Sequence, residues 1–177
     1  MTGCRECGFA DVEDHGGGTS GWHYREDRAG QAGRHVLSAC DQAARLLVSC
    51  EDAQLRVRAQ PDRWSTLEYG CHVRDVLLVQ RERVLKALRG HGHEFMAMGR
   101  DERVEHDGYN GQDPYNVAAQ IEQSALMFTS LLDRLTDEDW ELTITYMFPD
   151  PDLRRLRWVA VHTAHEVVHH LADMQRR

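Results

Sequence analysis

The stretch HEVVH at residues 165–169 has the spacing of a metal-binding pair on a helix. Two histidines four positions apart fall on the same side of an α-helix, so His165 and His169 can converge on one cation while Glu166 stays available as a base. Zinc proteases with this motif take a third ligand from further along the chain. Because only eight residues follow His169, we expect the third ligand to come from upstream, and a protease function is not favoured.

His72, in the segment E-Y-G-C-H-V-R-D-V, is the upstream candidate. It lies one turn from Tyr69 and Val76 and faces apolar neighbours on the same side of its predicted helix. The histidines of the last predicted helix lie on a face flanked by Val161 and Val168, where charged imidazoles without partners are costly and a metal would satisfy them. Two simpler interpretations stay open: His72 is a hydrogen-bonded core histidine, and the pair His165 and His169 belongs to a polar face of the last helix.

Four long amphipathic helices are expected to position these residues. Ser65 can cap the second helix with Glu68 as its capping-box partner, and Trp64 and Tyr69 can form a hydrophobic staple. Apolar residues that recur at steps of three and four predict the helices over approximately residues 29–50, 65–89, 114–135 and 151–174.

Asp-Pro pairs mark the starts of the last two predicted helices. In Asp113-Pro114 and Asp150-Pro151 the aspartate can cap the helix while the proline takes its first position. The chain looks extended between the second and third helices, and again over residues 141–148, where apolar and polar side chains alternate. The predicted fold class is therefore all-α, a four-helix bundle of residues 29–177 with long, partly extended connections.

Residues 1–28 are predicted to form an extension outside the bundle. Cys4 and Cys7 in C-R-E-C-G have the spacing of zinc ligands, and His15 and His23 can complete a second zinc site. A redox dithiol and a disordered tail are the alternatives that stay open. The odd total of five cysteines argues against a disulfide framework.

The overall charge limits the classes of partner. A net charge of -8 and a pI near 5.7 argue against nucleic-acid binding, which relies on clustered positive charge. No run approaches the roughly 18 apolar residues of a membrane span, and the first residues lack the features of a secretion signal. We therefore expect a cytoplasmic protein with neither a nucleic-acid nor a membrane partner.

Three separated segments together resemble the DinB-like superfamily, which includes mycothiol-dependent maleylpyruvate isomerases and related thiol S-transferases. They are W-S-T-L-E-Y-G-C-H-V-R-D-V (64–76), Y-N-G-Q-D-P (109–114) and W-V-A-V-H-T-A-H-E-V-V-H-H-L-A-D (158–173). The likeness covers about residues 30–177. The N-terminal C-x-x-C-G-F is similar to that of actinobacterial members.

The resemblance implies a divalent metal held by one histidine of the second helix and by an H-x-x-x-H or E-x-x-x-H pair of the last helix. We assign these positions to His72, His165 and His169. Three protein ligands leave coordination open for water or substrate. Zinc suits an imidazole set, with nickel, iron and manganese as alternatives.

The neighbours of this predicted site have candidate roles. Glu166 is the candidate catalytic base, with a solvated helix position as the alternative. Trp158, Tyr109 and Asn110 are candidate walls of a cofactor or substrate site.

The implied function is a metal-dependent enzyme that uses a low-molecular-weight thiol, mycothiol in an actinobacterial source, as an S-transferase or isomerase acting on a small electrophile. The alternative is a non-catalytic metal-binding protein of a stress response. We expect a small-molecule substrate and a thiol cosubstrate. A homodimer is also expected, because the last predicted helix has two faces suited to burial.

Overall fold

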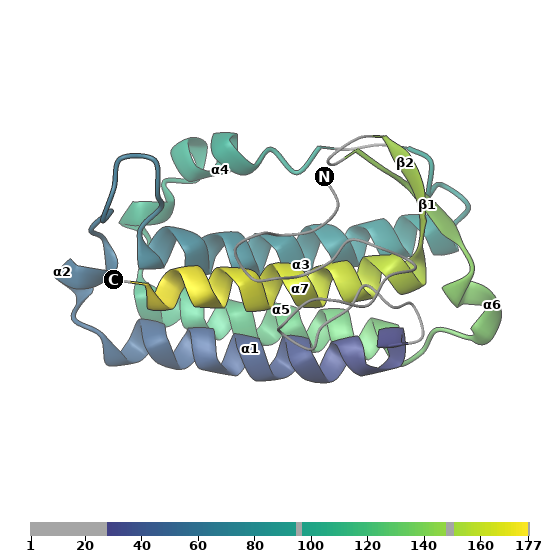
Figure 1. Ribbon diagram of the computed structural model, residues 1–177, viewed down its shortest axis with the longest axis horizontal. Coiled ribbons are helices and arrows are strands. Elements are labelled where there is room, and N and C mark those ends of the chain that lie inside the picture. The colour runs from purple at the N-terminus through teal and green to yellow at the C-terminus, as the bar shows by residue number, and fades with distance from the viewer. Residues whose placement is uncertain (1–27, 95–96, 148–150, 177) are drawn as a thin grey trace, which may run out of the picture.

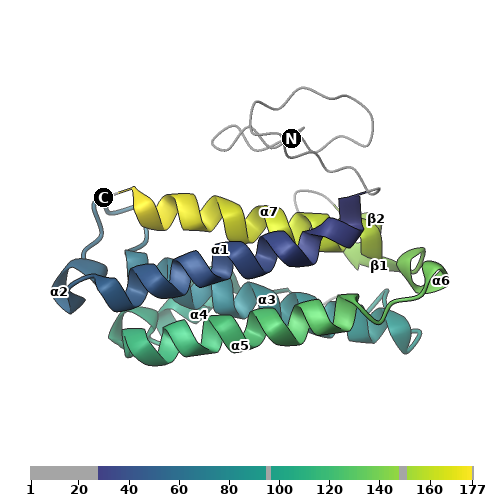
Figure 2. The ribbon, with the colours of Figure 1, turned by 90° about the horizontal axis from the view of Figure 1, so that it is seen from below.

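The computed structural model describes residues 28–94, 97–147 and 151–176. The helices α1 and α3 each make their main contacts with α5 and α7, so α1 and α3 occupy opposite corners of a bundle. This arrangement confirms the predicted all-α, four-helix fold class. The four long helices lie side by side in both views (Figures 1 and 2) and are α1 (Ala29–Ser49), α3 (Thr66–Leu88), α5 (Pro114–Leu132) and α7 (Leu156–Gln175).

The long helices do not simply alternate in direction. Helices α3 and α5 both run from the end that carries α2 (Asp52–Leu55) to the end that carries α6 (Asp137–Trp140), and α1 and α7 run the opposite way (Figure 1). The chain between α3 and α5 must therefore return along the bundle. It contains α4 (Arg100–His106) and the 3-10 helix η2 (Tyr109–Gly111), so the extended course predicted for this connection is wrong in that part.

A short hairpin precedes α7. Strand β1 (Thr143–Tyr146) pairs antiparallel with β2 (Asp152–Arg155), which agrees with the extended segment predicted over 141–148. The helix start predicted at Asp150-Pro151 is wrong, because the backbone of residues 152–155 pairs with β1 and α7 begins only at Leu156.

The start of α3 is the one predicted from sequence. The Ser65 hydroxyl accepts a hydrogen bond from the Glu68 backbone N–H at 3.2 Å, and the Glu68 carboxylate accepts one from the Ser65 N–H at 2.7 Å. The rings of Trp64 and Tyr69 lie 5.4 Å apart, as expected for the staple. These contacts fix where α3 begins, and with it the direction in which His72 points.

The core lies between the four helices, and aliphatic residues such as Leu47, Leu77 and Val167 are fully buried in it. Gly70 of α3 leaves room for the Leu47 side chain of α1, because a Cβ at Gly70 would lie 2.9 Å from it. Cys71 is also buried, as a small apolar residue would be. Among the described residues, no helix is both long enough and apolar enough to span a membrane.

Candidate metal centre

His72 lies in the second turn of α3, and its side chain is only 2% exposed. Burial lowers its pKa to about 3, and the nearby His170 acts in the same direction. The ring is therefore neutral, which is the form that binds a metal. Within the described part of the chain, its Nδ1 atom is buried and has no hydrogen-bond partner. Such an atom is rare in a folded protein unless a water or an ion satisfies it.

Two residues of α7 face this ring. His72, Glu166 and His170 form the His72 group, in which one ligand atom of each residue lies within 4.8 Å of the others. The rings of His72 and His170 meet edge-on at 4.7 Å, and His170 Nε2 lies 3.6 Å from Glu166 Oε2. Two imidazoles and one carboxylate from two packed helices thus converge on one point.

His170 is surrounded by negative charge. Its Nδ1 lies 3.1 Å from the Asp173 carboxylate. Burial alone would lower the pKa of His170, but the contacts with Asp173 and Glu166 raise it to about 9. The two carboxylates therefore favour a positive charge at this ring, which either a proton or a metal ion can supply. Asp173 also fixes the ring orientation, as a carboxylate partner of a ligating histidine does.

Glu166 is ionised. Burial would raise its pKa, but the contact with His170 and the proximity of His162 and His165 outweigh this and hold the pKa well below its usual range. Its other oxygen, Oε1, faces a second set of histidines. His162 Nε2 and His165 Nδ1 each lie 3.8 Å from it. These three residues form the His162 group, whose ligand atoms also lie within 4.8 Å of one another.

A third set, the His169 group, consists of His169, His170 and Asp173. His169 Nε2 lies 3.4 Å from the Asp173 carboxylate. The three groups share Glu166 and His170, so they form one continuous row along α7. His165 is 8% exposed, and burial lowers its pKa to about 3. This ring, like that of His72, is neutral.

Aromatic side chains enclose both ends of the row. At one end, the His162 ring stacks on Trp158 at 4.4 Å and meets the edge of Tyr146 at 5.1 Å. At the other end, Tyr69 stacks on His170 at 5.5 Å and Trp64 meets His72 edge-on at 5.0 Å. The imidazoles therefore lie in apolar surroundings that limit their contact with water.

The comparison with protein families agrees with this arrangement. Residues 37–174, most of the chain, match the DinB superfamily. The chain belongs to the DinB superfamily. The DinB resemblance inferred from sequence is thus confirmed at the level of the superfamily.

The fold of this DinB protein is similar to that of YfiT from Bacillus subtilis, described as a probable metal-dependent hydrolase with an unusual four-helix bundle topology. The TM-score is 0.72, with 16% sequence identity over 85% of this chain and 87% of YfiT. At this identity the likeness concerns the fold. No curated protein matches the DinB chain.

The ligand set predicted for this DinB protein is not the set that the structure brings together. Among the described residues, no group unites His72 with His165 or His169. Successive helix positions are turned by about 100°, so the side of α7 that meets α3 bears Glu166 and His170. The predicted pair lies one position earlier and belongs to the other two groups.

Sequence reasoning therefore missed His170 as a candidate ligand. The signal was present, because E-x-x-x-H at 166–170 overlaps H-x-x-x-H at 165–169 with a shift of one residue. Glu166, predicted as a catalytic base, instead lies among the candidate ligands of two groups.

The three predicted wall residues have different positions. Tyr109 is fully buried and donates a hydrogen bond to Asp75 at 2.6 Å. Asn110 accepts one from Ser65 at 2.8 Å and donates one to the Arg56 carbonyl at 2.9 Å. These two residues hold the connection before α5 against the N-terminal half of α3. Trp158 does line the candidate centre, at the His162 group. The predicted zinc ligands Cys4, Cys7, His15 and His23 lie outside the described residues.

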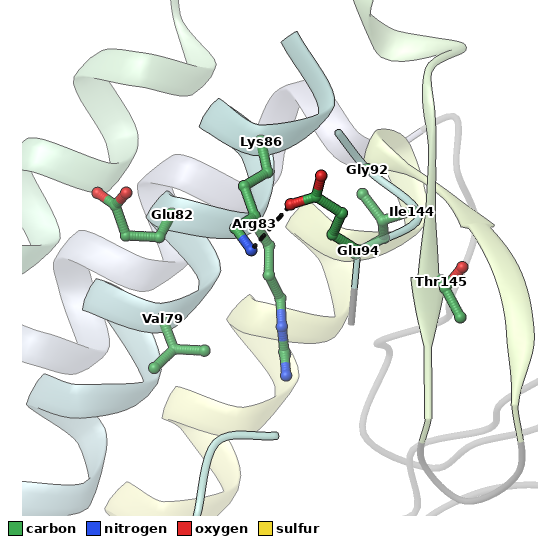
Figure 3. A pocket seen from close by; sticks show the side chains of 8 residues that line it. All are labelled: Val79, Glu82, Arg83, Lys86, Gly92, Glu94, Ile144 and Thr145. Atoms are coloured by element: carbon green, nitrogen blue, oxygen red, sulfur yellow. Dashed lines mark ion pairs between the residues drawn. The ribbon is translucent and has the colours of Figure 1, made fainter. Parts of the chain in front are cut away.

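A surface depression lies between the C-terminal half of α3 and β1 (Figure 3). Figure 3 shows Lys86 and Glu94 facing each other across it as an ion pair of 3.9 Å. None of the candidate metal ligands lines this depression. It is lined by Val79, Glu82, Arg83, Lys86, Gly92, Glu94, Ile144 and Thr145.

Proposed function

We propose that this protein is a metal-dependent enzyme that activates a small nucleophile at the His72 group. The observation that carries the proposal is the convergence of His72, Glu166 and His170 around one point, with the Nδ1 atom of His72 buried and unpartnered within the described residues. YfiT is itself described as a probable metal-dependent hydrolase, which supports a metal-dependent reaction on this fold.

The side chains of the His72 group fit a divalent cation. The ring of His72 is neutral and the carboxylate of Glu166 is ionised, which are the protonation states that metal binding needs. Two imidazoles and one carboxylate are a ligand set that zinc accepts while coordination stays open. Nickel, iron and manganese suit the same nitrogen and oxygen donors. When bound, the cation supplies Lewis acidity that lowers the pKa of a nucleophile.

The residues around the group position its ligands. Asp173 holds the His170 ring through Nδ1, which leaves Nε2 directed toward Glu166. Trp64 and Tyr69 cover the rings of His72 and His170 and exclude water from that side. We therefore assign the ligand role to the His72 group and the orienting role to Asp173.

We infer that the nucleophile is a low-molecular-weight thiol, such as mycothiol, and that the reaction is an S-transfer or an isomerisation of a small electrophile. The inference of a thiol nucleophile comes from the resemblance of the three sequence segments to thiol-dependent members of the superfamily. Water is the second candidate nucleophile, because two histidines and one glutamate are the ligand set of hydrolytic zinc sites. A non-catalytic metal-binding role is the remaining alternative.

The experiment compares wild-type protein with His72→Gln and with His106→Ala, which changes an exposed histidine of α4. Each protein is stripped with a chelator and reloaded with Zn²⁺, Ni²⁺ or Mn²⁺, and bound metal is measured. We expect His72→Gln to lose the metal at this group while His106→Ala keeps it. Metal binding unchanged in His72→Gln, with a native circular-dichroism spectrum, would contradict the assigned group.

The same reloaded proteins are assayed for conjugation of mycothiol to monobromobimane and for hydrolysis of p-nitrophenyl acetate. We expect metal-dependent conjugation that His72→Gln abolishes. Metal-dependent ester hydrolysis without conjugation would show that the nucleophile is water and not a thiol. Full metal loading with neither activity would favour the non-catalytic role.

A further inference from the structure

The carboxylate of Glu166 faces two different sets of histidines. Its Oε2 atom lies 3.6 Å from His170 Nε2 in the His72 group. Its Oε1 atom lies 3.8 Å from His162 Nε2 and 3.8 Å from His165 Nδ1. One side chain thus offers one oxygen to each of two neighbouring groups.

The two separations between Glu166 and the histidines of the His162 group, 3.8 Å each, exceed hydrogen-bond length, which ends near 3.2 Å for N–H···O. The two separations from Glu166 are close to the spacing of atoms that ligate one ion, since tetrahedral ligands about 2.1 Å from zinc lie about 3.4 Å from one another. The ligand atoms of His162 and His165 lie within 4.8 Å of each other, so both imidazoles have to move toward a shared ion. The two imidazoles and the carboxylate thus direct their ligand atoms toward one shared region beside α7.

The His162 group is also held in place by its surroundings. His162 is 7% exposed and His165 is 8% exposed. The His162 ring is fixed by stacking on Trp158 and by the edge of Tyr146. The Tyr146 hydroxyl in turn accepts a hydrogen bond from Gln80 of α3 at 3.1 Å. Packed side chains that cannot rotate freely are the support that a metal site requires.

We propose that His162, His165 and Glu166 bind a second divalent cation, so that the Glu166 carboxylate bridges two metal ions. The bridge rests on the proposed function, because it needs the first cation at the His72 group. Binding of a cation to the His162 group does not depend on that first cation. The donors are nitrogen and carboxylate oxygen, which suit zinc, manganese or iron. When both are bound, two neighbouring cations stabilise both the attacking and the leaving atom of a displacement reaction.

The His169 group does not extend this row to a third ion. It consists of His169, His170 and Asp173, and the contact of 3.1 Å between His170 Nδ1 and Asp173 fixes the ring of a first-site ligand. Asp173 therefore has the role of an orienting carboxylate.

The test measures zinc per chain in full-length protein after chelation and reloading. All variants are made in a Cys4→Ser, Cys7→Ser background, so that zinc bound by those cysteines is not counted. We expect about two zinc ions per chain in this background and about one in His165→Ala. His72→Gln also retains about one, and His106→Ala, with its exposed histidine, retains two. Circular dichroism checks that each variant is folded, and His165→Asn replaces His165→Ala if the latter is not.

The outcomes separate this proposal from the proposed function. One zinc per chain that His72→Gln removes and His165→Ala leaves would overturn the second site and keep the first. One zinc that His165→Ala removes and His72→Gln leaves would support the site at the His162 group and overturn the site at the His72 group.

The bridge between the two ions is tested by electron paramagnetic resonance of the Mn²⁺-loaded protein. We expect an exchange-coupled spectrum in the background protein and loss of the coupled signal in Glu166→Gln, and an uncoupled spectrum in the doubly loaded background protein would overturn the bridge.

Discussion

Two buried polar regions border α3, and they differ in how their polar atoms are satisfied. In the third turn of α3, the Asp75 carboxylate accepts hydrogen bonds from Tyr109 at 2.6 Å, Arg74 at 2.7 Å and Arg103 at 3.0 Å. Along α7, nitrogens of three histidine rings lie 3.6 to 3.8 Å from the carboxylate oxygens of Glu166, and His72 Nδ1 has no partner among the described residues.

The difference distinguishes a structural network from a binding site. Buried polar groups are almost always paired, because an unpaired one costs free energy. The Asp75 network pairs its own donors and acceptors, so it needs no ligand and contributes to stability. The histidine row along α7 places several nitrogens and oxygens around shared points, which is what a cation requires.

The largest effect that tests this comparison is expected from Asp75→Ala. The change removes the acceptor of Tyr109 and Arg74, both largely buried, and of the more exposed Arg103. Removing one partner of a buried charge network costs about 3 to 5 kcal/mol of unfolding free energy. Urea denaturation measures the loss, and metal content per folded chain is expected to stay unchanged. A loss under about 1 kcal/mol would mean that the network is not structural.

Glu166→Gln tests the other region. The change removes a negative charge from two candidate groups with little change of shape, so we expect metal affinity to fall at least about 100-fold, or about 3 kcal/mol. Competition with a chromogenic chelator measures the affinity. His106→Ala, with its exposed histidine, serves as the control. An unchanged affinity in Glu166→Gln would remove this residue from the ligand set.

Asp173→Asn is expected to have a smaller effect. The amide no longer favours the charge and orientation of His170, and loss of such an outer partner weakens metal binding about 10- to 100-fold. The same chelator competition gives the affinity, with Asp62→Asn on the exposed chain before α3 as the matched control. Equal affinities for the two variants would show that Asp173 does not act on the centre.

Ser65→Ala is expected to have the smallest effect. It removes the cap of α3 and the hydrogen bond to Asn110, which costs about 1 kcal/mol of unfolding free energy. Thr136→Ala removes the corresponding capping box of the short, exposed helix α6 and should cost less. Thermal unfolding compares the two. A larger loss in Thr136→Ala would contradict the role of Ser65 in positioning α3.

Local sequence signals predicted most of the bundle. Ser65 and Glu68 marked the start of α3, and Asp113 caps α5 as expected, with its carboxylate 2.8 Å from the Asn116 N–H. The same Asp-Pro signal failed at Pro151. There the following residues pair with β1, so a tertiary contact overrides the local preference of the chain.

The candidate site shows the same limit. Spacing indicated that α7 carries ligands four residues apart, and His72 was found on α3. Choosing between the pairs 165/169 and 166/170 required the rotation of α7 about its axis, which depends on how deeply Leu171 and Val167 pack into the core. A shift of one residue turns the helix face by about 100°. Apolar periodicity does not determine which face of α7 meets α3 when both faces contain apolar residues.

Tyr146 covers one end of the histidine row from a hairpin of only two strands, and such a ribbon is marginally stable by itself. It is held by the hydrogen bond from Gln80 and by that from the Thr145 N–H to the Gly92 carbonyl at 3.0 Å. The Tyr146 ring also packs against Trp158 and lies under Arg83, and Ile144 of β1 is buried in the core. The hairpin therefore has one packed strand, β1, and one largely exposed strand, β2. The low effective dielectric around His162 thus depends on a strand outside the four long helices.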